Sequence, residues 1–181
     1  MNIWLNPNKF FKKEITPNKL LFINLFVLLF AIIILDLSMI NILNINGNRK
    51  IIVFFLISTL ITIPFYYIVN FIFSVLLSII LVFFKRDLSV LKLYSIVCTS
   101  NCFNLLFNTV GLYIILINND QHVFYTLNIV LLIMNVLSIR ILYFGLINYV
   151  KVTKKISFVL SFVIISIMFI FTGYGGIHYA G

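Results

Sequence analysis

The sequence predicts an all-α protein, a polytopic transmembrane helix bundle of about five spans. Of its 181 residues, 63% are hydrophobic and only 9% are charged, whereas soluble domains are about 45–50% apolar and about 25% charged. Stretches between the charged residues also exceed the roughly 18 apolar residues that mark a spanning helix. A water-soluble protein of this size needs far more polar surface, so we expect the lipid bilayer to surround most of the chain.

The first segment, 1–19, is expected to be a cytoplasmic amphipathic element at the membrane interface. Asn6 followed by Pro7 fits the cap and first position of a short helix, and Thr16 followed by Pro17 repeats this pattern before the first span. Aromatic side chains beside lysines are typical of a helix that lies in the headgroup layer. The candidate lipid anchors are Trp4, Phe10, Phe11, Lys12 and Lys13.

Apolar runs then divide the transmembrane domain, 20–172, into five expected spans. We place them at about 20–40, 51–84, 94–117, 123–150 and 156–171, with a short external tail at 173–181. The second run is too long for one ordinary span and too short for two, because two spans and a turn need about 40 residues. We therefore expect one helix, either kinked or interrupted at Pro64.

The distribution of Lys and Arg predicts the topology. If the N-terminus is cytoplasmic, ten basic residues lie on the cytoplasmic side and two, Arg49 and Lys50, lie outside. Such a bias follows the positive-inside rule, and it puts the C-terminus outside. The cytoplasmic ten are Lys9, Lys12, Lys13, Lys19, Lys85, Arg86, Lys92, Lys151, Lys154 and Lys155.

Arg140 is the one basic residue expected inside a span, about 15 Å from the cytoplasmic Lys151 if the helix is regular. A charge at that depth is a functional hypothesis by default, since it costs several kcal/mol unless it is paired or hydrated. Snorkelling to the interface, or a structural partnership with neighbouring polar groups, is the alternative. Asp36 is the only acid within a span, and we expect it at the outer headgroup boundary.

Asparagines form stripes on two of the expected spans. Asn101, Asn104 and Asn108 share one helical face, and Asn128 and Asn135 are seven residues apart on the next span. Such stripes usually join helices through hydrogen bonds worth about 0.6–2 kcal/mol each. A pathway for a polar solute would use the same side chains, so these residues and Arg140 form the candidate intramembrane polar site.

Little in the sequence suggests catalysis. It contains only four acids and two histidines, and no catalytic set, metal box or phosphate loop, so we predict no enzyme, cofactor or metal site. Cys98 and Cys102 are interpreted as small buried thiols that do not pair. The basic residues flank apolar spans, which favours lipid headgroups over nucleic acid as their partner.

At its N-terminus the chain resembles bacterial members of the Ypt-interacting protein (YIP) family. The run Trp4-Leu5-Asn6-Pro7-Asn8-Lys9-Phe10-Phe11 is similar to their aromatic residue and x-Pro-x-x-Phe-Phe element before the first span. Five spans, a basic loop after the second, the stretch Leu91–Tyr94 and the junction Phe144–Lys155 also fall in matching places. A proline that members often carry in the third span is missing here.

The resemblance implies a non-enzymatic accessory or scaffold protein in a bacterial plasma membrane. It implies association with an ABC transporter, or protection against membrane-active peptides. Eukaryotic relatives contact Rab GTPases through a long N-terminal region that this chain lacks, so Rab binding is not expected. From the residues we expect anionic lipid and a membrane-protein partner or homo-oligomer. The alternative is a small transporter or channel subunit for a polar or anionic solute.

Overall fold

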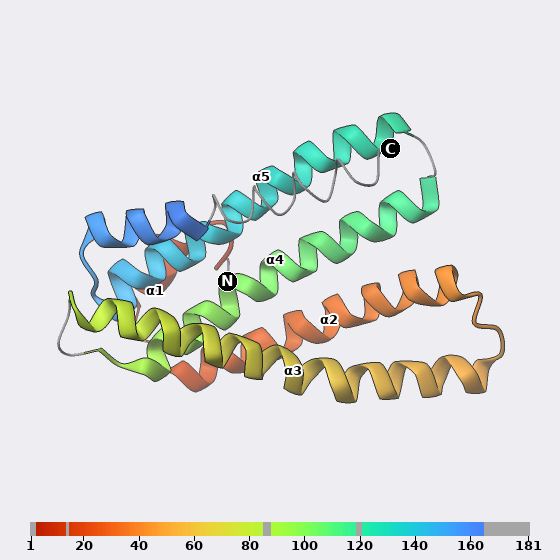
Figure 1. Ribbon diagram of the computed structural model, residues 1–181, viewed down its shortest axis with the longest axis horizontal. Coiled ribbons are helices and arrows are strands. Elements are labelled where there is room, and N and C mark those ends of the chain that lie inside the picture. The colour runs from red at the N-terminus through yellow and green to blue at the C-terminus, as the bar shows by residue number, and fades with distance from the viewer. Residues whose placement is uncertain (1–2, 14, 85–87, 119–120, 165–181) are drawn as a thin grey trace.

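The computed structural model of the protein describes residues 3–13, 15–84, 88–118 and 121–164. Its regular elements are all helical, which confirms the predicted fold class (Figure 1). In chain order they are α1 (Pro7–Phe11), α2 (Pro17–Leu43), α3 (Asn48–Val82), α4 (Val90–Asn118), α5 (Gln121–Gly145) and the π-helix η1 (Leu146–Val150). A further helix covers residues 154–164.

Four helical stretches in the described residues are long and apolar enough to cross a membrane. They are Pro17–Leu43, Asn48–Val82, Val90–Ile114 and Leu132–Val150. The fifth expected span, 156–171, continues past residue 164, and the tail 173–181 lies wholly outside the described residues. The described structure therefore provides four candidate spans, and the fifth stays a prediction.

The two cap-and-proline signals at the start of the chain are confirmed as helix starts. Asn6 Oδ1 accepts a hydrogen bond from the Lys9 N–H at 3.1 Å, with Pro7 as the first residue of α1. Thr16 Oγ1 accepts from the Lys19 N–H at 3.4 Å at the start of α2. In both cases a side-chain oxygen takes up one of the amide groups that the first turn of a helix leaves without a partner.

A tight reversal joins α2 to α3, so that the two helices run side by side in opposite directions (Figure 1). Asn44 adopts a left-handed conformation with φ of 51°, and Gly47 has a φ of 101°. The Ile45 N–H then donates to the Ile40 carbonyl at 3.1 Å, closing the last turn of α2. Asparagine and glycine are the residues that reach these angles at least cost.

Helix α3 is a single element of 35 residues that continues through Pro64. Of the two sequence expectations, an interrupted helix is thereby excluded. Its buried residues, Asn70, Ser74, Leu77, Ser78 and Leu81, all lie in the second half. The first half has no fully buried residue, and Leu56, Leu60 and Phe65 are 66%, 76% and 67% exposed. The two halves of α3 therefore have different surroundings.

Helix α4 is the centre of the bundle, because it packs against α2, α3, α5 and η1. It lies tightly against α5 at Gly145. A Cβ atom at this position would lie 2.7 Å from Cγ2 of Ile96. Small residues permit such close contact between membrane helices, so Gly145 sets the spacing of α4 and α5 at this level.

The main hydrophobic core lies at the end of the bundle where α1 packs against α5 and η1. It combines residues from both ends of the described chain. Its buried members are Ile3, Phe10, Phe11, Leu20, Leu77, Leu81, Leu93, Ile96, Val97, Ile141, Leu142, Leu146, Tyr149, Val150 and Val152. A second, smaller cluster of Leu28, Ile32 and Cys102 lies between α2 and α4.

Candidate functional site

The predicted asparagine face of α4 is a set of hydrogen bonds that joins three helices. Asn101 Nδ2 donates to Oδ1 of Asn70 on α3 at 2.5 Å. Further along α4, Asn108 Nδ2 donates to Asn104 Oδ1 at 2.7 Å, and Asn135 Nδ2 on α5 donates to Asn108 Oδ1 at 3.4 Å. The stripe therefore links α4 to both neighbours, as hydrogen-bonded amides in membrane helices do.

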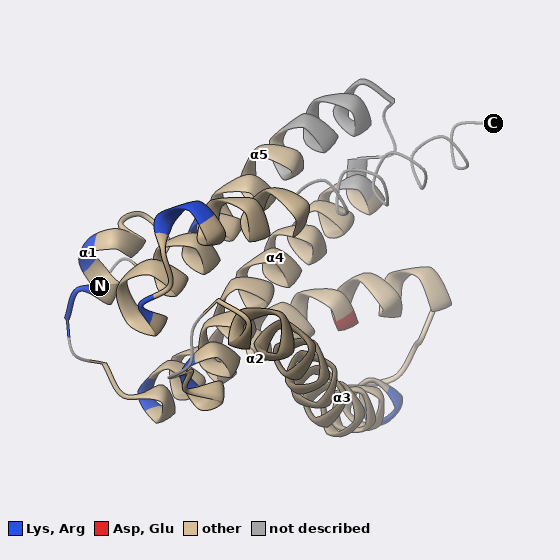
Figure 2. Ribbon diagram, turned by 60° about the vertical axis from the view of Figure 1, so that its left-hand side comes forward, with Lys and Arg blue, Asp and Glu red and all other residues tan. Residues whose placement is uncertain are grey.

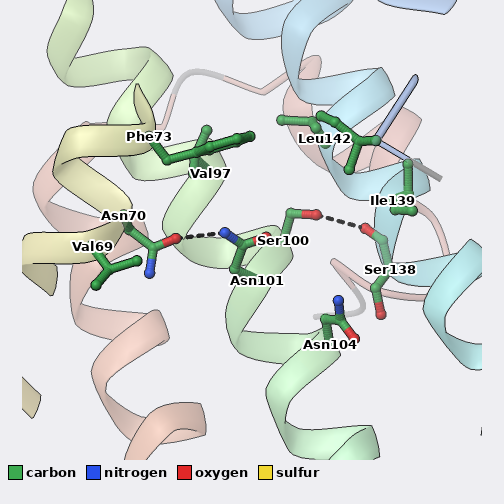
Figure 3. A pocket seen from close by; sticks show the side chains of 11 residues that line it. Val69, Asn70, Phe73, Val97, Ser100, Asn101, Asn104, Ser138, Ile139 and Leu142 are labelled. Atoms are coloured by element: carbon green, nitrogen blue, oxygen red, sulfur yellow. Dashed lines mark hydrogen bonds between the residues drawn. The ribbon is translucent and has the colours of Figure 1, made fainter. Parts of the chain in front are cut away.

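A cavity of about 270 Å³ lies beside this row, between α3, α4, α5 and residue 164. Figure 3 shows the Asn101–Asn70 bond and the Ser100–Ser138 bond at its polar side. Its lining residues are Val69, Asn70, Phe73, Val97, Ser100, Asn101, Asn104, Ser138, Ile139, Leu142 and Ile164. Of the predicted polar-site residues, only Asn101 and Asn104 line it, and Asn70 was not foreseen.

Arg140 does not join the amide row. Its side chain is exposed, it is not among the cavity-lining residues, and it forms no ion pair or hydrogen bond within the described part of the chain. The neighbouring Ile139 turns into the cavity instead (Figure 3). The side chain of Asn128, on α5, lies outside the described residues. The structure thus separates the arginine from the asparagines with which the sequence grouped it.

A second polar cluster, centred on Asn24 of α2, is one that the sequence reasoning missed. Asn24 Nδ2 donates to the Cys98 carbonyl at 2.8 Å and to Tyr66 Oη at 3.3 Å, while Tyr66 Oη also donates to that carbonyl. A carbonyl has two lone pairs, so it accepts bonds in addition to the one within its helix. Asn24 is the only polar residue between Leu20 and Leu35, and this isolation was the available signal.

Asp36 is buried rather than placed at an open headgroup boundary. Only 1% of its surface is exposed, and its Oδ1 accepts a hydrogen bond from the Ser58 hydroxyl of α3 at 2.6 Å. Its Oδ2 is buried and has no hydrogen-bond partner among the residues that the structure describes. The carboxyl group therefore lies between α2 and the first half of α3.

The N-terminal segment is packed into the bundle by its aromatic side chains. Phe10 and Phe11 are 5% and 2% exposed, and the Phe11 ring lies 6.0 Å from that of Tyr149 on η1. Asn148 Nδ2 also donates to Asn8 Oδ1 at 3.1 Å. The expected lipid-anchoring role of these two phenylalanines differs from this arrangement, because protein atoms cover both rings.

Trp4 packs against α4 at a point further along the bundle than the rings of Phe10 and Phe11. Its ring lies 5.3 Å from that of Phe107, which is 17 residues, or about 25 Å, along α4 from Val90. Ile3 is 5% exposed in the same core. Backbone that is not helical can lie at membrane depth only where protein covers it, and here α4 provides that cover. Of the expected anchors, Lys12 and Lys13 alone remain exposed.

The positions of Lys and Arg gather at the end of the bundle where α1 lies, and a smaller group lies at the start of α3 (Figure 2). The Lys92 ammonium lies 5.3 Å from the centre of the Tyr149 ring. Lys92 therefore contacts a residue of the main hydrophobic core. Lys151, Lys154 and Lys155 follow η1 and are exposed. Residues that the sequence assigned to one side of the membrane are therefore neighbours in space.

Within residues 3–13, 15–84, 88–118 and 121–164, no three His, Cys, Asp or Glu residues come together as metal ligands. Cys98 and Cys102 are buried free thiols, as interpreted from their spacing. The cavity presents amides and hydroxyls, which bind and orient a molecule through hydrogen bonds but do not supply a proton at neutral pH.

Comparison with known protein families gives a match. Residues 1–175 match the Yip1 domain. The chain belongs to the Yip1 family. Members of this family are generally non-enzymatic proteins of membrane trafficking. No curated protein and no solved structure matches the chain. The amide row, the buried Asp36 and the inserted Trp4 are therefore features of this Yip1-domain protein described from its own structure.

Proposed function

We propose that this Yip1-domain protein is a non-enzymatic accessory protein that docks on another membrane complex through the first half of α3. The observation that carries the proposal is that α3 is much longer than the hydrocarbon layer of a bilayer is thick. At about 1.5 Å per residue, the 35 residues of α3 extend about 52 Å, against a hydrocarbon thickness of about 30 Å. The helix would need a tilt of roughly 55° to fit, beyond the range of about 0–40° seen for membrane helices.

Exposed apolar residues run along the whole of α3, and its first half has no residue that the chain itself buries fully. Leu56 and Leu60 are 66% and 76% exposed, and buried residues begin only at Asn70. A partner helix packed on this half would remove the mismatch without extreme tilt, and association is one recognised response to such mismatch. The exposed lysines beside η1 would meanwhile hold anionic headgroups of one leaflet, at about 1 kcal/mol for each lysine.

Resemblance to bacterial members of the family supports an ABC transporter as the partner, in a bacterial plasma membrane. We propose that this complex protects the cell against membrane-active peptides. This role predicts that cells lacking the protein become more sensitive to cationic antimicrobial peptides. Unchanged survival of the deletion strain over a range of peptides would remove this role but leave the docking proposal in place.

The docking proposal is tested by purification in a mild detergent, followed by mass spectrometry of the associated proteins. We expect a transporter in fixed stoichiometry, and at least fivefold less of it with the double variant Leu56→Ala/Leu60→Ala. The matched control is Phe22→Ala/Phe26→Ala, which changes two residues of α2 that are 60% and 61% exposed and should retain the partner.

Two results would contradict docking. One is recovery of the protein alone, or only as a homo-oligomer, under conditions that preserve other membrane complexes. The other is specific solute flux through liposomes that contain only this protein, which would favour the transporter alternative. An anion path through Arg140 is not proposed, because Arg140 is exposed and lies outside the amide-lined cavity.

A further inference from the structure

The cavity between α3, α4 and α5 combines apolar walls with amides at one side. Asn101 lies 11 residues, about 16 Å, along α4 from Val90, so its amide is within the hydrocarbon region of a bilayer about 30 Å thick. At that depth a polar group without a partner is costly, because no bulk water is present to bind it. The hydrogen-bonding state of each lining group therefore indicates what the cavity accepts.

The 11 residues that line the cavity include no charged side chain. The polar side chains among the 11 residues are asparagines and serines only, and the exposed Arg140 is not one of them. A charged ligand would have to enter this space without a counter-charge, at a cost of several kcal/mol. The occupant that fits the lining is consequently uncharged.

The hydrogen bonds of the lining leave the amide oxygen of Asn101 open as an acceptor. Asn101 uses its Nδ2 to donate to Asn70 Oδ1, and no hydrogen bond among the described residues ends on Asn101 Oδ1. The Ser100 hydroxyl donates to the Ser138 carbonyl at 3.0 Å, and the Ser138 hydroxyl donates to the Met134 carbonyl at 3.0 Å. With both hydroxyl protons already used, the best match for Asn101 Oδ1 is a ligand that brings its own donor.

Size and access define the rest of the occupant. A volume of about 270 Å³ exceeds that of an apolar cavity of about 150 Å³ that takes up benzene. It is therefore large enough for an alkyl chain with at least the six carbons of benzene. Val69 and Phe73 line the cavity while remaining 45% and 37% exposed, so its entrance is on the outer surface of α3, where bilayer lipid lies.

We infer that this cavity binds a single uncharged amphiphile from the bilayer, with a short alkyl chain inside and a hydroxyl group that donates to Asn101 Oδ1. This function is separate from docking through the first half of α3, because the cavity is lined by the second half. It assigns to the asparagine row a ligand as well as a role in helix packing.

Photolabelling in lipid nanodiscs tests this inference. The probe is decan-1-ol that carries a diazirine near the end of its chain, and labelled residues are located by mass spectrometry. We expect saturable labelling of cavity-lining residues. Unlabelled decan-1-ol should displace the probe at a concentration at least tenfold lower than decane or decanoate, because decane lacks the donor and decanoate is charged.

Two variants, each with a matched control, test the acceptor and the entrance of the cavity. Asn101→Leu removes the acceptor and should lower specific labelling at least fivefold, whereas Asn135→Leu, in the same hydrogen-bonded row but outside the lining, should leave it within twofold. Val69→Trp blocks the entrance from the outer surface of α3 without changing any buried residue, and its control is the adjacent Ile68→Trp at a position 58% exposed. Labelling should be lost in the first tryptophan variant and retained in the second.

The inference is overturned if decane competes as well as decan-1-ol, or if labels spread over lipid-facing residues in proportion to exposure. Equal labelling of Val69→Trp and Ile68→Trp would also overturn it. This last comparison does not depend on Asn101→Leu folding correctly, because both substitutions are at exposed positions.

Discussion

The carboxylate of Asp36 and the hydroxyl of Ser58 form a 2.6 Å hydrogen bond that joins α2 to α3 in the part of the hairpin far from the main core. The second carboxylate oxygen is buried and has no partner in the described part of the chain. A polar group in this state is sensitive to loss of its single donor, because removing one partner leaves the other with its full desolvation cost.

Ser58→Ala should therefore destabilise the hairpin by about 1–3 kcal/mol. The double variant Asp36→Leu/Ser58→Ala should recover most of that loss, since no buried polar group then remains unpaired. Thermal unfolding in detergent measures both effects, with Thr59→Ala as the control on the same helix. Equal unfolding midpoints for Ser58→Ala and Thr59→Ala would show that the hydrogen bond contributes nothing.

Gly145→Ala is expected to be destabilising, although alanine is favoured over glycine in a helix by about 1 kcal/mol. The added Cβ would lie 2.7 Å from Cγ2 and 2.9 Å from Cδ1 of Ile96, and such overpacking typically costs about 1–3 kcal/mol. Ile96→Ala removes both atoms, so it should rescue Gly145→Ala in a double-mutant cycle. Additive effects in that cycle would argue against close contact of α4 and α5 here.

Trp4 is the only tryptophan in the chain, so its fluorescence reports on the N-terminal segment alone. Its position 5.3 Å from the Phe107 ring predicts blue-shifted emission and poor quenching by acrylamide. Phe107→Ala should shift the emission to the red and increase quenching. If the unaltered protein shows the emission of an exposed indole, this prediction is wrong and Trp4 lies in the headgroup layer.

Cys98 and Cys102 are both 0% exposed, so neither should react with a maleimide while the protein is folded. This permits topology mapping with single added cysteines. Lys12→Cys and Lys154→Cys should be labelled from one side of sealed vesicles, and Arg49→Cys from the other. Labelling of all three from the same side would reject the topology inferred from the positive-inside bias.

Features that depend on a few neighbouring residues were predictable from the sequence. Asn6 with Pro7, and Thr16 with Pro17, begin helices because the cap bond forms within three residues. Length predicted one span rather than two in the run 51–84, but it left open whether Pro64 kinks or interrupts the helix. The shared face of Asn101, Asn104 and Asn108 followed from helical periodicity, and the bonds of Asn101 and Asn108 to α3 and α5 agree with the expected packing role.

Features that depend on the placement of helices relative to one another were not predictable. Spacing alone gives no reason for Asn24 to meet the Cys98 carbonyl, 74 residues away. Likewise, an aromatic helix beside lysines has the same sequence pattern whether lipid or protein covers its rings, so Phe10 and Phe11 carried no signal that distinguished the two. Arg140 joined the asparagines in the sequence analysis because of its expected depth, although it is five residues, or about 140° around the helix, from Asn135.

Contact between the two ends of the described chain also imposes an order in time. Asn8 and Asn148 are hydrogen-bonded across 140 residues, and Phe11 packs on Tyr149. At about 5–20 residues per second, synthesis leaves roughly 7–28 s between the emergence of these partners. During that interval α1 exists without its binding surface, and its two phenylalanines must rest on the bilayer or on a chaperone. The nascent protein is thus expected to hold its first helix at the membrane surface before the completed bundle takes it in.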